Sequence, residues 1–147
     1  MAGRLAGKKV LLLGAGSVGE GIGNGRAMAV IFAREGADIV GVDLNLPAAQ
    51  ETAKLVKAEG REMIALAGDV TDPKDLARII DEAERRLGRI DILVNNVGGS
   101  IPGGPEEISP EQWDAQFRFN VDYVHNSTRI LAPRMAKQGG GAIVNIS

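Results

Sequence analysis

The chain has 147 residues, of which 44% are hydrophobic, and its formal net charge is −2. This length is enough for one domain with a sizeable apolar core. Lysine and arginine number 17 against 19 acidic residues and form no basic run, so a nucleic-acid partner is not expected. Cysteine is absent and His125 is the single histidine, which excludes disulfides and predicts no metal site.

The first ten residues, MAGRLAGKKV, carry one short apolar run that glycine interrupts. This pattern is unlike a secretory signal peptide, and no apolar segment reaches the length that spans a membrane. The sequence therefore predicts a cytoplasmic protein without a membrane partner.

Apolar runs alternate with helical patterns along the whole chain. Strands are expected at residues 9–13, 37–43, 63–67, 90–94 and 142–146, and helices at 26–35, 47–59, 73–87 and 110–138. The strands are almost entirely apolar, which is typical of strands covered on both faces. This alternation indicates an α/β fold with a doubly wound parallel sheet and right-handed crossovers, formed by a single domain over residues 1–147.

The connection between the first strand and the first helix is dense in glycine. It reads GAGSVGEGIGNG from Gly14 to Gly25. Because glycine lacks a Cβ, such a loop can turn sharply and bring backbone amides close to a phosphate, and the start of the following helix adds a partial positive charge. The loop therefore predicts a nucleotide-phosphate site, with a merely flexible loop as the alternative.

Two registers of these glycines compete. The first matches G-x-G-x-x-G over residues 14–19, with Asp43 24 positions beyond it, close to the spacing of a dinucleotide fingerprint. It would begin the helix in residues 20–25, where four of the six residues disfavour helix. The second register uses Gly14 with Gly23 and Gly25, and it predicts a helix that begins near Gly25.

The longest helical pattern follows Ser109, which forms a capping box with Gln112 and precedes a proline at the first helical position. An apolar stripe recurs every three or four residues, at Trp113, Phe117, Val121, Val124, Thr128, Leu131 and Met135. The stripe predicts one helix packed on the sheet and interrupted only at Pro133, which should kink the axis. Tyr123, Asn126 and Ile130 are expected on the outward face.

Five segments resemble, in order and spacing, the motifs of the short-chain dehydrogenase/reductase family. They are the glycine loop with Arg26-Ala27, GDVTDP from Gly68, DILVNNVGG from Asp91, FNVDYVHNSTRILAPRM from Phe119 and GGAIVNIS from Gly140. The glycine pair lies five residues later than in the family's T-G-x-x-x-G-x-G, and Leu13 replaces its threonine. The resemblance implies a Rossmann-like sheet of strand order 3-2-1-4-5, with five strands visible and the family's later strands absent.

Asp43 ends the second strand, where its carboxylate can accept hydrogen bonds from an adenosine ribose and would repel a 2′-phosphate. The family uses an acid here for NAD, so NAD is the expected cofactor and NADP the less favoured one. The positive charge of Arg26 argues against this preference for NAD. Alternatively, Asp43 is an ordinary solvated turn residue without a role in binding. The family also places Asp69 and Val70 against adenine, with a plain turn capped by Asp69 as the alternative.

The segment NNVG resembles the family's N-N-A-G, whose second asparagine and glycine line the nicotinamide-ribose region. The first asparagine of that motif ties strands together, so Asn95 is expected to be structural. The expected cofactor-binding residues are Gly14, Ala15, Gly16, Ser17, Gly23, Asn24, Gly25, Asp43, Leu44, Asp69, Val70, Asn96, Val97 and Gly98.

Asn120 is expected to be a buried polar residue, and the resemblance gives it the position that holds a water in the family's proton relay. An internally satisfied core asparagine is the alternative. The family's catalytic serine and Tyr-x-x-x-Lys follow the fifth strand, and Ser147 resembles the residue just before that serine. No Tyr-x-x-x-Lys occurs here, because Ser127 stands four residues after Tyr123.

The resemblance implies an NAD-dependent oxidoreductase that transfers hydride between nicotinamide and the alcohol or carbonyl of a small-molecule substrate. The chain is expected to be its cofactor-binding half, truncated before the active site, with weakened NAD binding and no turnover. The alternative is a stand-alone dinucleotide-binding module that serves as a sensor or interaction protein. The helix from Pro110 resembles the family's oligomer-forming helix, so the full-length protein is expected to be a homo-oligomer.

Overall fold

The computed structural model describes residues 3–19 and 21–147. Residues 1–2 of the N-terminal pattern and residue 20, where the first glycine register would begin its helix, lie outside the described residues. The strands are β1 (Lys9–Leu13), β2 (Asp38–Asp43), β3 (Met63–Ala67), β4 (Ile92–Asn95) and β5 (Ala142–Asn145). The helices are α1 (Asn24–Arg34), α2 (Leu46–Ala58), α3 (Pro73–Leu87), α4 (Pro110–Phe117) and α5 (Tyr123–Lys137), with a π-helical turn, η1 (Arg118–Asp122), between the last two.

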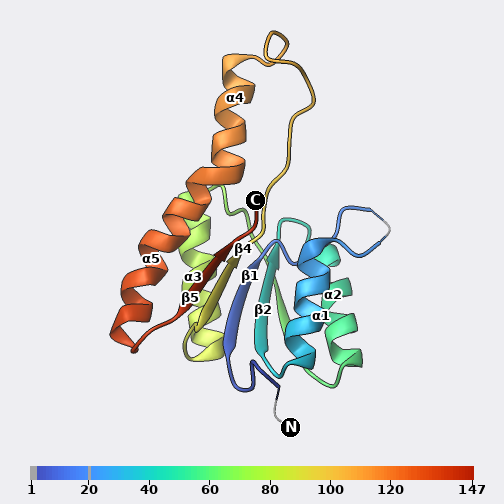
Figure 1. Ribbon diagram of the computed structural model, residues 1–147, viewed down its shortest axis with the longest axis vertical. Helices are drawn as coiled ribbons and strands as arrows, with labels where there is room; N and C mark the ends of the chain where they lie inside the picture. The colour runs from blue at the N-terminus through green and yellow to red at the C-terminus, as the bar shows by residue number, and fades with distance from the viewer. Residues whose placement is uncertain (1–2, 20) are drawn as a thin grey trace.

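The five strands form one parallel sheet in the order β3-β2-β1-β4-β5 (Figure 1). At its centre, Leu11 of β1 lies opposite Val40 on one side and Leu93 on the other. The predicted α/β class and strand order are therefore confirmed. All five strands end at the same edge of the sheet because they run in the same direction.

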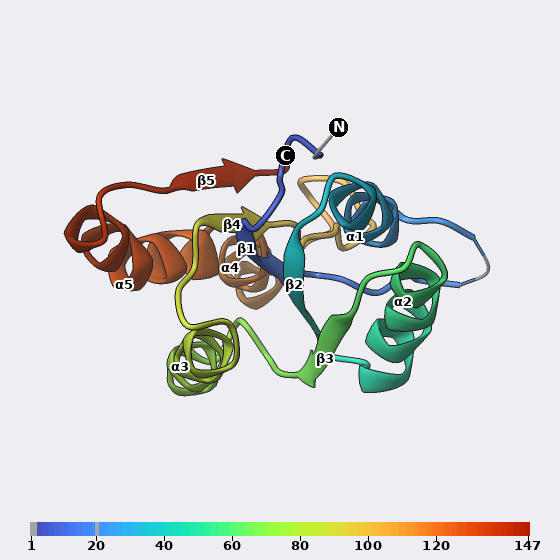
Figure 2. The same cartoon turned by 90° about the horizontal axis from the view of Figure 1, so that it is seen from below.

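Helices cover both faces of this sheet, with α1 and α2 on one side and α3 and α5 on the other (Figure 2). Successive side chains of a strand point to opposite faces. Leu11 and Leu13 accordingly pack in the core with α3 and α5, whereas Val10 and Leu12 pack with α1 and α2. All four side chains are fully buried, which explains why the strands carry no polar face.

Local sequence signals set the helix ends. The Asp72 carboxylate accepts a hydrogen bond from the Lys74 amide (2.9 Å) at the start of α3, and Gly88 adopts a left-handed φ of 82° at its end. Ser109 and Gln112 form the predicted capping box of α4. No helix in the described residues has both the length and the apolar character needed to cross a membrane.

The last helical segment differs from the prediction. It continues through Pro133, and its irregularity is the π-helical turn η1, fifteen residues before the expected site. A π-helical turn holds more residues than an α-helical turn, so the helix face before it does not continue in line after it. A single interruption at Pro133 was therefore the wrong prediction.

The change of face overturns the first three of the seven residues in the predicted apolar stripe. Before and within the turn, Trp113, Phe117 and Val121 are 59%, 47% and 50% exposed. The face of α5 that packs on the sheet instead consists of residues four apart, namely Tyr123, Ser127, Leu131 and Met135. Tyr123 is only 1% exposed, so its expected outward position is wrong.

A chain of polar side chains links α5 to the edge strand of the sheet. The Ser127 hydroxyl donates to the Asn95 side-chain oxygen (2.9 Å), and the side-chain amide nitrogen of Asn95 donates to the Asn145 side-chain oxygen (2.8 Å). Asn95 and Ser127 are fully buried, so these bonds satisfy groups that would otherwise destabilise the core. Asn95 therefore ties β4 to β5, the structural role that was expected.

The packing of α1 on the end of β1 predicts the effect of one substitution. A Cβ added at Gly25 would lie 1.8 Å from the Gly14 carbonyl oxygen. Gly25→Ala should therefore lower the free energy of unfolding by about 3 kcal/mol, because backbone must move to remove the clash. Urea denaturation followed by circular dichroism measures this change.

Gly104→Ala is the matched control, since its added Cβ would come no closer than 3.7 Å to the Glu107 carboxylate. That variant should stay within about 0.5 kcal/mol of the wild type. Equal stability of the two variants would contradict the close approach of α1 and β1.

Candidate functional site

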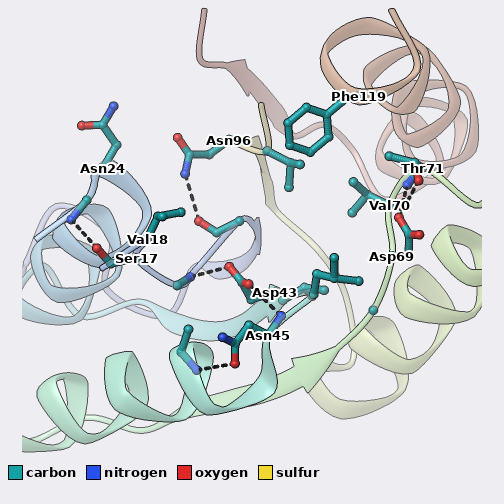
Figure 3. A pocket seen from close by; sticks show the side chains of 18 of the residues that line it. Ser17, Val18, Asn24, Asp43, Asn45, Asp69, Val70, Thr71, Asn96 and Phe119 are labelled. Carbon is teal, nitrogen blue, oxygen red and sulfur yellow. Dashed lines mark hydrogen bonds between the residues drawn. The ribbon is translucent and has the colours of Figure 1, made fainter. Parts of the chain in front are cut away.

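A cleft of about 620 Å³ lies across the carboxyl ends of β1, β2, β3 and β4 (Figure 3). Open parallel α/β sheets bind ligands at this edge. The lining residues are Gly14, Gly16, Ser17, Val18, Gly19, Gly23, Asn24, Val42, Asp43, Leu44, Asn45, Ala48, Gly68, Asp69, Val70, Thr71, Asn96, Val97 and Phe119. The cleft thus brings together segments from the first hundred residues with one side chain from η1.

The glycine loop forms one wall of the cleft. The chain leaves β1 through Gly14, which has a φ of 88° and whose amide donates to the Val42 carbonyl (2.8 Å). Further along the loop, the Gly23 amide donates to the Ser17 hydroxyl (3.2 Å) and so joins the two ends of this part of the loop. Gly23 caps α1, which begins at Asn24. This helix start agrees with the second glycine register.

The beginning of α1 suits an anion. Gly23 has no side chain to cap the first amide groups, and the first turn holds no acidic residue. Such amides and the helix dipole favour a negatively charged group. Gly23 and Asn24 both line the cleft, so the anion-attracting end of the helix faces the cavity.

Asp43 lies between the loop and α2, with its carboxylate held by two backbone amides. One oxygen accepts from the Gly16 amide and the other from the Asn45 amide, both at 2.9 Å (Figure 3). Each carboxylate oxygen can accept a further hydrogen bond, so Asp43 retains the capacity to bind hydroxyl groups. The neighbouring Leu44 is 76% exposed and gives this end of the cleft an apolar surface.

Arg26 is turned toward the outer part of the loop. Its guanidinium donates to the Gly21 carbonyl (2.9 Å) and to the Thr52 hydroxyl (3.3 Å). Arg26 is absent from the cleft lining, whereas Asp43 lines it. The charge that the cleft presents at this end is therefore negative.

Asp69 and Val70 form the wall beyond β3. One Asp69 carboxylate oxygen accepts from the Thr71 amide (2.9 Å) and hydroxyl (2.6 Å), so the turn that was the alternative reading is present. The Asp69 amide donates to Asp75 (2.7 Å). The hydrogen bond from Arg78 is the main cause that holds the pKa of Asp75 below its usual value, and the hydrogen bond from the Asp69 amide adds to it. The ionised Asp75 carboxylate then holds the turn in place.

The segment after β4 forms a further wall of the cleft through Asn96 and Val97. The Asn96 side-chain amide donates to the Gly14 carbonyl (2.9 Å), which joins this segment to the glycine loop. Asn120 forms two bonds to Gly99, accepting from its amide (3.0 Å) and donating to its carbonyl (2.9 Å). Asn120 is half-buried, so its expected full burial is wrong, but its polar atoms are paired.

Tyr123 holds the same segment from below. Its hydroxyl donates to the Val97 carbonyl at 2.6 Å. Burial raises the pKa of Tyr123 to about 12, because the charged phenolate is disfavoured away from water. The phenol therefore stays protonated at neutral pH and acts as a hydrogen-bond donor.

Most of the expected cofactor residues line the cleft, with three exceptions. Ala15 is fully buried beneath it, Gly25 packs on Gly14, and Gly98 is exposed beside Asn120. Asn120 and Ser147 do not line the cleft either, and Ser147 lies exposed after β5. In residues 3–19 and 21–147, no three His, Asp or Glu side chains group as metal ligands would.

Sequence reasoning missed several lining residues, among them Val18, Asn45, Thr71 and Phe119. Asn45 and Thr71 each follow a recognised acidic residue at a strand end, which was an available signal. Phe119 is one residue before Asn120, but the predicted helix was regular as far as Pro133 and gave no reason to turn Phe119 toward the cleft. Its position follows from the π-helical turn η1.

The fold and cleft define a Rossmann-like α/β domain with a glycine-rich loop at the carboxyl edge of its sheet. A family model described as short chain dehydrogenase matches residues 8–147. The chain therefore belongs to the short-chain dehydrogenase/reductase family of oxidoreductases.

Individual relatives agree with this assignment. An uncharacterised oxidoreductase of Thermotoga maritima is 40% identical over 96% of this chain and 53% of its own length. The crystal structure of a short-chain dehydrogenase/reductase from Burkholderia xenovorans matches with a TM-score of 0.95 and 46% identity, covering 99% of this chain and 56% of that one. A short chain dehydrogenase from Mycobacterium paratuberculosis, bound to NAD, has a TM-score of 0.85 and 34% identity over 99% and 57%. The chain thus spans about half the length of the relatives it matches.

The Asn120 contacts predict the mobility of the segment after Val97. Asn120→Ala removes both hydrogen bonds to Gly99, so the Gly99 amide should exchange with solvent about ten-fold faster, corresponding to roughly 1.4 kcal/mol of lost protection. Hydrogen exchange measured by NMR gives this rate. Exchange at Gly99 as slow as in the wild type would show that Asn120 does not hold the segment.

Proposed function

We propose that this protein is an NAD(H)-dependent oxidoreductase of the short-chain dehydrogenase type. It transfers hydride between the nicotinamide of its cofactor and the alcohol or carbonyl group of a small-molecule substrate. The chain carries the cofactor-binding half of this activity. The observation that supports the proposal most directly is the Asp43 carboxylate, fixed by two backbone amides at the edge of the glycine-lined cleft.

The cleft fits a dinucleotide in size and chemistry. Its volume of about 620 Å³ falls in the range of cofactor sites. Gly14, Gly16 and Gly23 leave room for a pyrophosphate beside the start of α1, where amide groups and the helix dipole attract negative charge. NAD supplies a nicotinamide ring that accepts or gives hydride, and the protein supplies its position.

Asp43 supports NAD over NADP. Its carboxylate can accept hydrogen bonds from the adenosine ribose and repels a 2′-phosphate. Arg26, the residue that argued for NADP, donates instead to Gly21 and Thr52. Under this proposal Leu44, Asp69 and Val70 hold adenosine, with Val70 buried to 5% exposure.

The other half of the cleft then holds the nicotinamide ribose. Asn96, Val97 and Gly98 lie at the end of β4 and are assigned to it. Asn120 is assigned to the proton relay and Ser147 to the approach to the catalytic serine. The family's Tyr-x-x-x-Lys does not occur in these 147 residues, so we expect them alone to bind NADH without turning it over.

A non-catalytic dinucleotide-binding module is the second candidate, and the family of oxidoreductases to which the chain belongs does not favour it.

A homo-oligomer remains part of the proposal. The exposed apolar side chains Trp113, Phe117 and Val121 on α4 and η1 support it. We also place the protein in the cytoplasm.

Titration with NADH and NADPH, followed by nicotinamide fluorescence, tests the cofactor assignment. The wild type should bind NADH at least about ten-fold more tightly than NADPH. Asp43→Asn should reduce this ratio about ten-fold, or roughly 1.4 kcal/mol, because the charge that repels a 2′-phosphate is lost.

Asp114→Asn makes the same charge change on the exposed surface of α4, outside the cleft lining, and should leave the ratio unchanged. A wild type that prefers NADPH would overturn NAD as the cofactor. A wild type that binds neither nucleotide would overturn the dinucleotide site itself.

A further inference from the structure

Tyr123 is the single tyrosine of the sequence, and the function proposed above gives it no part. Its side chain is 1% exposed and lies under the segment that follows β4. A buried phenol needs a partner for its hydroxyl. The partner is the Val97 carbonyl, at 2.6 Å, in the part of the chain that lines the cleft.

The π-helical turn brings Tyr123 to this place together with Asn120. Both side chains bind backbone groups of the same short segment, Tyr123 at Val97 and Asn120 at Gly99. Asn96 is held separately, by its bond to the Gly14 carbonyl. The segment 96–99 is therefore held at the glycine loop by the side chain of Asn96, and at η1 and α5 by the side chains of Asn120 and Tyr123.

We propose that Tyr123 is a positioning residue for the cofactor, because it fixes the Val97 carbonyl and thereby the wall of the cleft that faces the nicotinamide half. The inference rests on the proposed dinucleotide function. Tyr123 itself is not among the cleft residues, so it acts through Val97. Its proton is engaged by that carbonyl, which leaves it no part in proton transfer.

This position implies an effect on one half of the ligand alone. The adenosine half is bounded by Asp43, Asp69 and Val70, at the ends of β2 and β3. The Tyr123 hydroxyl instead bonds the segment after β4, on the other side of β1 in the sheet. A change at the hydroxyl should therefore alter binding of the nicotinamide half and spare the adenosine half.

Tyr123→Phe tests the inference, since it removes the hydroxyl and keeps the ring in the core. Isothermal titration of the protein with NADH and with ADP-ribose, which lacks nicotinamide, separates the two halves. The NADH dissociation constant should rise about five-fold, equivalent to about 1 kcal/mol. The ADP-ribose constant should change less than about two-fold.

Ser127→Ala is the matched control, one helical turn further along the same face of α5. It removes a buried hydrogen bond to Asn95, so it should lower the melting temperature without separating NADH from ADP-ribose. A purely structural role of Tyr123 would produce this same pattern in Tyr123→Phe and would overturn the inference. Unchanged NADH binding in Tyr123→Phe would overturn it as well.

A second measurement keeps the Tyr123 hydroxyl in place. Because the sequence has one tyrosine, 3-fluorotyrosine labels Tyr123 alone, and its ¹⁹F resonance reports on the bond to Val97. The resonance should shift with NADH and stay within about a linewidth with ADP-ribose. Equal shifts with both ligands would overturn the inference, and binding of neither ligand to the wild type would overturn the proposed function along with it.

Discussion

The contact between the start of α1 and the end of β1 is the constraint on which the site depends. A Cβ at Gly25 would lie 1.8 Å from the Gly14 carbonyl oxygen, so the helix reaches that carbonyl only because Gly25 has no side chain. The same oxygen accepts a hydrogen bond from the side-chain amide of Asn96 at 2.9 Å. One backbone carbonyl therefore joins the glycine loop, the first helix and the segment after β4, and a shift of any one of them moves the other two.

The last helix both packs on the sheet and hydrogen-bonds to the segment 96–99. Its later turns must bury Leu131 and Met135 against the sheet, while its first turn must pair polar groups of the segment 96–99. An uninterrupted α-helix would keep the stripe of Trp113 and Phe117 in line with the buried face. The π-helical turn instead leaves those rings exposed and brings Asn120 and Tyr123 to the segment. Such turns occur frequently at functional sites, and this one places Phe119 in the lining of the cleft.

The sequence predicts the sheet and most of the helices because their signals are local. Apolar runs, Pro73 and Pro110 at helix starts and glycines at helix ends each act within a few residues, and these elements lie where they were expected. The helix start at Asn24 was also predictable, since glycine and asparagine in residues 20–25 weaken any earlier start. These features need no knowledge of distant residues.

The position of Tyr123 was not predictable in the same way. In a regular helix, the predicted apolar stripe assigns the buried face to other residues. Tyr123 was therefore predicted to lie on the exposed face. The Val97 carbonyl that receives its hydroxyl lies 26 residues earlier in the sequence. The π-helical turn and the packing of α5 against the sheet bring the two together, so the error arose from a contact that local periodicity does not encode.

Asp43 shows how the glycine loop and the acidic residue depend on each other. A Cβ at Gly16 would lie 2.7 Å from the Asp43 carboxylate, so the Gly16 amide reaches that carboxylate only because position 16 is glycine. Gly16 belongs to the G-x-G-x-x-G reading, which would assign it to the phosphate. The hydrogen bond to Asp43 gives Gly16 a further task beside leaving room for the phosphate, because it helps to fix the orientation of the carboxylate before any ligand binds. The proposed discrimination against a 2′-phosphate thus depends on loop glycine and acid together, since a carboxylate free to rotate would repel that phosphate less.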